Sequence, residues 1–517
     1  MGRIFSMPIW AALGAIVTFG LVCASETKAQ TLGQPCNLLH DVMRSNPGEP
    51  DSSDPNRLTP IDATTKDEIL TSGLPCDEIN TDRGPDPNLA PIENRQRGFD
   101  FFSWLTFIAL NAPAANPKGI ATSQPDSPTV WEDSKNFIQL LDVMLPGGAQ
   151  PTWGEKVIPP ACSSQYERDK SLMIVKMIEE SYNQPFKTGV LIDQHNNYAI
   201  FDILMNKAMF DYIVDHHLYS RAGQSNSANA GLRIDFPSGH HDYKGGDPGA
   251  IMLKVSWKIL TPEDDESKFH HVDALVAMPS TADEQDDPPC LRRTLGLVGF
   301  HIVHKTINRP QWIWTTFEHV KNVPEQQEVD AHNADPATHK LNPPYNFYDP
   351  SCSPEMCSVN ETPPRPWDPE AANELQFRRN ADGRILFNSQ ITRVVPLTPA
   401  TRDMNTKFQS ILGGTVWENY MLISTQWPSA FPCTGDRAKN APEPRTDFEK
   451  QPDMNCAPAP TFLANSTLET FSQGEIPLAS SSCMACHGNA TSYLRAKNPN
   501  DIYFNQSDFT FMLEKAR

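Results

Sequence analysis

Residues Ile251–Ile259 read IMLKVSWKI, in which every second residue is large and apolar and the intervening positions include two lysines and a serine. Successive side chains of an extended strand point to opposite faces, so this period of two predicts a β-strand. Further strand candidates follow at 272–278, 295–305 and 311–318. Closely spaced strands without intervening helices predict an antiparallel sheet or sandwich.

Helices are expected before and after this group of strands. Residues 97–111 are densely aromatic and apolar, which predicts a buried helix that ends before Pro113. Asn206 is expected to cap a second helix, and residues 404–412 form an amphipathic pattern that Gly413 stops. Residues 416–424 are predicted as one more strand. The predicted class is α+β, an antiparallel β-rich body with several helices and a C-terminal segment packed on it.

The composition limits the possible partners and suggests how the chain is divided. A formal net charge of −20 and a pI of about 5.1 argue against nucleic acid and anionic membrane surfaces as partners. The 47 prolines gather in a few segments that we expect to be long loops. We predict a signal peptide at 1–29, a loop-rich segment at 30–93, an α+β body at 94–424, and a Pro-rich loop with a C-terminal functional segment at 425–517.

A cysteine-histidine motif lies near the C-terminus. Residues Cys483–His487 read CMACH, the C-x-x-C-H pattern of a c-type haem attachment site. One helical turn brings the two thiols to the two vinyl groups of a haem, and the histidine can then donate an imidazole nitrogen to the iron. We predict one covalent haem c on Cys483 and Cys486, with His487 as the proximal iron ligand.

Two other chemistries use a pair of cysteines at this spacing. A zinc site requires two further ligands at matching spacing, and the chain has no second C-x-x-C. A thioredoxin-like dithiol opens a helix in a βαβ unit, which the Ser- and Pro-rich surroundings do not suggest. The motif therefore favours haem over zinc or a redox dithiol.

The N-terminus has the features of an export signal. Arg3 precedes an apolar run at 9–24, and the small-residue site Thr27-Lys28-Ala29 predicts cleavage near Ala29. The run is short for a membrane span, and no other long apolar run follows. Because haem c is attached outside the cytoplasmic membrane, we predict a periplasmic protein without membrane insertion after signal cleavage.

The remaining cysteines agree with an oxidising compartment. Of eleven cysteines, one lies in the predicted signal peptide and two in the motif, which leaves eight. An even number in an exported chain predicts disulfides. Nearness in sequence suggests pairs 352–357, 433–456 and 36–76, although spacing does not fix the pairing.

Four residues are candidates for the sixth iron ligand. Only 30 residues follow His487, too few to bury a haem alone, so the body must form much of the pocket. Met512 is the only methionine after the motif, and His301, His304 and His319 are the rival candidates for distal ligand or distal-pocket residue. On a strand, an offset of three places His301 and His304 on opposite faces. Each of the four is also compatible with an ordinary core position.

Four segments together resemble a family of predicted bacterial periplasmic monohaem cytochrome c proteins of unassigned activity. They are GLVGFHIVHK at 296–305, QWIWTTFEHV at 311–320, LANSTLET at 463–470 and SSCMACH at 481–487. The resemblance extends from about residue 95 to the C-terminus. It implies a covalent haem on Cys483 and Cys486 with His487 as axial ligand, and it adds no substrate.

Three functions are compatible with these features. The first is an exported c-type cytochrome in periplasmic electron transfer, which requires a strong sixth ligand and a redox partner with a basic docking surface. The second is a haem-dependent oxidoreductase acting on peroxide, oxygen or a substrate bound by the large body, with His304 or His319 as an acid–base group. The third is a haem-based sensor, for which no output domain is evident.

Overall fold

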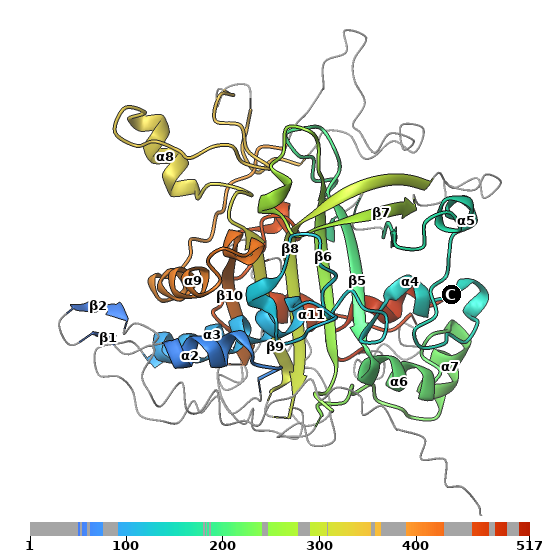
Figure 1. Ribbon diagram of the computed structural model, residues 1–517. Coiled ribbons are helices and arrows are strands. Elements are labelled where there is room, and N and C mark those ends of the chain that lie inside the picture. The colour runs from blue at the N-terminus through green and yellow to red at the C-terminus, as the bar shows by residue number, and fades with distance from the viewer. Residues whose placement is uncertain are drawn as a thin grey trace, which may run out of the picture.

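One large β-sheet with helices on both faces organises the chain (Figure 1). The computed structural model describes residues 50–51, 54–58, 63–75, 91–178, 181, 184–185, 188–239, 247–277, 290–307, 309–352, 357–362, 389–428, 458–474, 481–493 and 506–517. The helices are α2 (Ala63–Leu70), α3 (Pro91–Asn111), α4 (Leu140–Val143), α5 (Pro160–Tyr166), α6 (Lys207–Asp215), α7 (Arg221–Asn229), α8 (Gln326–Ala334), α9 (Pro399–Ile411) and α11 (Cys483–His487). The strands are β1 (Pro50–Asp51), β2 (Asp54–Leu58), β3 (Phe137–Gln139), β4 (Met173–Lys176), β5 (Ile200–Asn206), β6 (Ile251–Ile259), β7 (His271–Ala277), β8 (Cys290–Thr306), β9 (Arg309–His319), β10 (Tyr420–Pro428) and β11 (Pro458–Ala459).

The main sheet has nine strands within the described ranges. Its order is β11-β10-β9-β8-β6-β5-β3, with β7 paired to β8 and β4 paired to β7. All pairings are antiparallel except β4 with β7, which is parallel. The α+β class and the antiparallel, β-rich body predicted from the sequence are confirmed.

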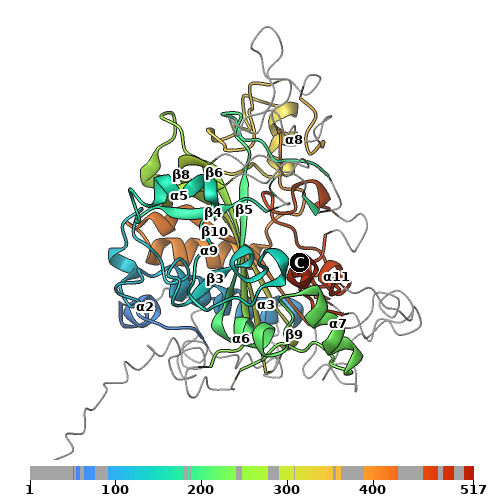
Figure 2. The ribbon, with the colours of Figure 1, turned by 90° about the vertical axis from the view of Figure 1, so that its right-hand side faces the viewer.

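The alternation along β6 divides the sheet into two faces. Leu253 and Val255 belong to the same buried cluster as the aromatic residues of α3, whereas Met252 belongs to a second cluster with Met484 and Met512. Figure 2 views the sheet close to edge-on, with α9 on one side and α11 and the C-terminus on the other. The C-terminal segment therefore packs on the face that α9 does not cover.

Helix α3 is buried between the sheet and α9, which accounts for the apolar residues on most of its sides. The rings of Trp104 and Phe408 of α9 stack with centroids 4.9 Å apart, and Phe107 stacks on Phe317 of β9 at 4.2 Å. This confirms the buried helix predicted at 97–111. The helix begins earlier, at Pro91, so it crosses the boundary that we placed at residue 94.

The predicted caps explain where two other helices begin or end. The Asn206 side chain accepts a hydrogen bond from Met209 N at the start of α6, as expected. Helix α9 ends at Ile411, just before Gly413. The strand predicted at 416–424 is wrong in its first half, because the Thr415 side chain caps a short 3-10 helix, Val416–Asn419, before β10 begins.

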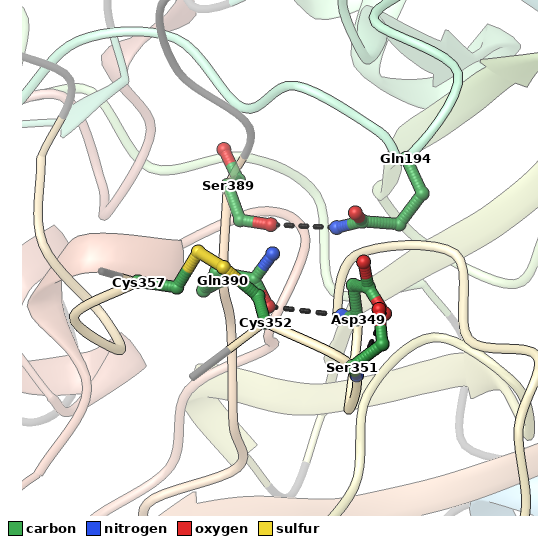
Figure 3. Close-up of a disulfide and its surroundings, with 7 residues drawn as sticks. All are labelled: Gln194, Asp349, Ser351, Cys352, Cys357, Ser389 and Gln390. Carbon is green, nitrogen blue, oxygen red and sulfur yellow. Dashed lines mark hydrogen bonds between the residues drawn. A yellow bond between two sulfur atoms is a disulfide. The ribbon is translucent and has the colours of Figure 1, made fainter. Parts of the chain in front are cut away.

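Two disulfides are present in the described part of the chain. Cys352–Cys357 matches a predicted pair and closes a short loop beside Asp349, whose backbone N–H donates to Gln390 (Figure 3). Cys162–Cys290 was not predicted, since its partners are 128 residues apart, and it ties α5 to the start of β8. The proposed pairs 36–76 and 433–456, and the signal peptide at 1–29, lie outside the described residues. None of the helices within the described ranges is long and apolar enough to span a membrane.

The two disulfides should differ in their contribution to stability. Loop-closure entropy predicts that removing Cys162–Cys290 lowers the free energy of unfolding by about 5 kcal/mol, and removing Cys352–Cys357 by about 2 kcal/mol. Guanidinium denaturation of the C162A/C290A and C352A/C357A variants measures both values. Equal losses in the two variants would contradict this ordering.

Candidate functional site

A cavity of about 400 Å³ lies on the face of the sheet that faces the C-terminal segment. This volume is in the range of ligand and cofactor sites. Its walls are formed by Leu140, Gln184, Pro185, Ile203, Met252, Leu253, Lys254, His301, Val303, Trp314, Thr315, Leu463, Glu469, Ser482, Cys483, Cys486, His487, Thr510, Phe511, Met512, Glu514 and Lys515. The sheet therefore supplies one part of the lining and the segments after residue 460 supply another, and Leu140, Gln184 and Pro185 complete it.

Strand register explains the composition of the sheet wall. Lys254 of β6 lies directly opposite His301 of β8, which forms a polar row across the two strands. Two residues along, Met252 pairs with Val303, and Val303 pairs with Trp314 of β9, which forms an apolar row. The cavity thus has a charged half and an apolar half, each fixed by the period of two.

The CMACH motif forms the short helix α11 at the edge of this cavity. Ser482 caps the helix by accepting from Ala485 N at 3.3 Å. Gln426 of β10 anchors the start of this helix to the sheet, since its Oε1 accepts from Met484 N at 2.8 Å. The spacing of three places Cys483 and Cys486 on one side of the helical turn, and neither forms a disulfide.

The orientation of His487 is fixed by one hydrogen bond. Its Nδ1 lies 2.8 Å from the backbone oxygen of Phe509, and because a carbonyl only accepts, Nδ1 carries the proton. Burial lowers the pKa of His487 to about 4, so the ring is neutral at physiological pH. The unprotonated Nε2 is then available to a metal, and a backbone carbonyl on the other nitrogen is the usual support of a ligating histidine.

The environment of the Cys483 thiol suits an uncharged linkage. Burial, together with Glu469 and Cys486, raises the pKa of the Cys483 thiol well above its ordinary value. A thiol that stays protonated is a poor metal thiolate, whereas addition of its S–H bond across a vinyl group would give an uncharged thioether. No cluster of three or more His, Cys, Asp or Glu side chains within the described ranges is arranged to hold a metal ion by itself. The donor set thus fits a covalent haem held by Cys483, Cys486 and His487.

A hydrogen-bonded pair of ionisable side chains joins two parts of the cavity lining, with His301 from β8 and Glu469 from the segment after residue 460. His301 Nε2 lies 2.9 and 3.1 Å from the two carboxylate oxygens of Glu469. Burial alone would raise the pKa of Glu469, but the charge and hydrogen bonds of His301, with Lys254 nearby, lower it to about 2. Three ionisable side chains therefore meet at the polar row, and Glu469 is ionised there.

The segment that carries Glu469 is locked onto the sheet by buried polar contacts. Glu318 of β9 accepts from both the backbone N and the hydroxyl of Ser466, at 2.6 and 2.5 Å, and is paired with Arg393 at 2.8 Å. Both partners of this ion pair are buried. A Cβ at Gly299 would lie 2.2 Å from Thr467 Oγ1, so only glycine allows this close approach. The sequences LANSTLET and TTFEH, which the family resemblance singled out, therefore contact each other.

The four predicted distal candidates separate into two groups. Met512 and His301 both line the cavity. His304 lies on the other face of β8, where its Nε2 donates to Pro248 O and its ring stacks with Phe102 of α3. His319 stacks on Phe269 and donates to Lys268 O, and burial lowers its pKa to about 4. Neither His304 nor His319 is among the cavity-lining residues, so the structure does not bring them to the predicted iron site.

Several residues of the site were not identified from the sequence. Glu469 and Lys254 enter the cavity, and Gln426 supports the motif helix. Lys254 had one visible signal, a charged residue within the most regular alternating strand. Comparison of the chain with protein-family models, with curated proteins and with solved structures found no match. The functional assignment therefore rests on the sequence motif and on the geometry of the site.

The Glu318–Arg393 pair should be needed to hold the segment that carries Glu469 on the sheet. Glu318→Ala leaves a buried guanidinium without its carboxylate, which should lower the free energy of unfolding by about 3–5 kcal/mol. The control is Arg402→Ala, which breaks a half-exposed pair with Glu325 and should cost at most about 1 kcal/mol. Denaturant unfolding measures both, and a loss in E318A no larger than in R402A would show that the pair is not required.

Proposed function

We propose that the protein is an exported c-type cytochrome that carries one covalent haem and transfers electrons in the periplasm. One observation carries the proposal: both motif thiols and an imidazole with an available Nε2 line a single cavity of cofactor size. The haem would be held by thioethers to Cys483 and Cys486, with His487 as the proximal iron ligand.

Two further features support export and a protein partner. Disulfides such as Cys162–Cys290 persist in oxidising compartments, which agrees with a periplasmic location. A net charge of −20 favours docking to a redox partner with a basic surface, because complementary charge steers association.

The chain's own residues perform the supporting tasks for electron transfer. A bound haem supplies an iron that accepts and releases one electron. The Phe509 carbonyl orients the His487 ring and raises the basicity of Nε2. Trp314 and Phe511 contact the same ring, with centroids 4.6 and 5.1 Å away, and exclude water from it.

Covalent attachment is directly testable. In a host that matures c-type cytochromes, the purified protein should show a Soret band that survives acid–acetone extraction, and its mass should increase by one haem. The C483A/C486A variant should lose the pigment on extraction. Colourless wild-type protein, or pigment that acid–acetone removes, would refute the proposal.

A haem-dependent oxidoreductase is the second candidate, and the His301–Glu469 pair favours it. Burying charged groups costs free energy, and a simple electron carrier has no use for an ionised carboxylate in the cavity. An imidazole held by a carboxylate is the arrangement that general acid–base catalysis uses. His301, rather than His304 or His319, would then be the acid–base group.

Carbon monoxide binding separates the two candidates. His301 Nε2 is engaged by Glu469, so we expect the Met512 thioether to be the sixth ligand of a carrier, and the ferrous wild-type protein should not bind the gas within seconds. Met512→Ala should bind it at once, whereas Met252→Ala, a control at another cavity methionine, should not. Optical spectra record the result. Immediate binding by the wild type would contradict the carrier and favour the oxidoreductase.

A further inference from the structure

The carbonyl that orients His487 belongs to an unusual turn. Residues 506–510 lie beside the motif helix, where Ser507 N donates to Ala490 O and Phe509 presents its backbone oxygen to His487 Nδ1. Asp508 and Phe509 have φ values of 51° and 64°, both in the left-handed region. Neither residue is glycine, so this backbone is adopted against the ordinary preference of L-residues.

Such a conformation has to be imposed by surrounding contacts. A left-handed residue other than glycine costs about 1–2 kcal/mol, and two in succession persist only where the environment determines them. Asparagine and aspartate tolerate this region better than a bulky residue such as Phe509. The contacts that hold the turn should therefore act mainly through Asp508.

The Asp508 side chain is anchored to β8. It is buried, and its Oδ2 accepts from Lys305 Nζ at 2.6 Å and from Phe236 N at 2.7 Å. Trp312 of β9 donates to Oδ1 at 3.4 Å. Lys305 is itself buried and has a second, more exposed carboxylate partner in Asp235. The carboxylate of Asp508 thus connects the turn directly to the central strands of the sheet.

Local hydrogen bonds complete the turn on its other side. Ser507 Oγ donates to Thr510 O at 2.5 Å, and Thr510 N donates to Ser507 O at 3.1 Å. Thr510 Oγ1 accepts from Met512 N and starts the 3-10 helix that carries Met512. The same turn therefore determines the positions of both the Phe509 carbonyl and Met512.

We propose that Asp508, held by the buried Lys305, is a positioning residue that fixes the Phe509 carbonyl on His487 and thereby sets the reduction potential of the iron. This inference rests on the proposed haem site. A firm hydrogen bond on Nδ1 makes the imidazole a stronger donor and favours the ferric state. Loosening the turn weakens that bond and favours the ferrous state.

The test compares two aspartates that contact the same lysine. Asp508→Asn keeps the size of the side chain and its tolerance of positive φ, but it removes the charge that pairs with Lys305. Asp235→Asn also removes a partner of Lys305 and is the matched control, because no hydrogen bond joins Asp235 to the turn at 507–510. Lys305→Gln removes the cation itself and serves as a second variant if D508N folds poorly.

Two measurements on the haem-loaded protein give the answer. The reduction potential of D508N and K305Q should shift to a more positive value, and the EPR g-values of the oxidised haem should change, while D235N should match the wild type. Haem-loaded D508N and K305Q with unchanged potential and spectrum would overturn the inference and leave the proposed function standing. A wild-type protein without covalent haem would instead refute the proposed function itself.

Discussion

The alternation of side chains along β6, β8 and β9, interrupted by one register shift in each strand pair, is the constraint on which the rest of the structure depends. It places an aromatic core with α3 and α9 on one face and the cavity with the C-terminal segment on the other. A shift of one residue in β8 would exchange His301 for a neighbour that faces α3. The antiparallel register therefore determines both what stabilises the fold and which residues meet the CMACH motif.

The sequence predicted features that depend on local pattern. The alternation of Ile251–Ile259, the aromatic density of α3 and the cap at Asn206 each reflect interactions within a few residues, and each was identified correctly. The parallel pairing of β4 with β7 and the Cys162–Cys290 disulfide depend on segments about a hundred residues apart. No local signal carries such information.

The candidate site also contains residues that local pattern reveals and residues that only distant contacts bring together. Cys483, Cys486 and His487 could be predicted as candidates because one helical turn contains the whole motif, and the structure places all three at one cavity. Alternation correctly separated His301 from His304, but it could not say which face would meet the motif. Glu469 lies 168 residues from its partner His301, and Asp508 lies 203 residues from Lys305. Residues that orient a site often come from such distant segments, and only the folded chain brings them together.

The position of Cys483 between the cavity and the segment at 506–517 has a consequence for how its sulfur is reached. The Cys483 side chain is partly exposed and lines the cavity, while Met512 and Leu513 of the neighbouring segment pack in the same cluster as Met484. Any change that loosens the packing of residues 506–517 would therefore also change how accessible the Cys483 sulfur is.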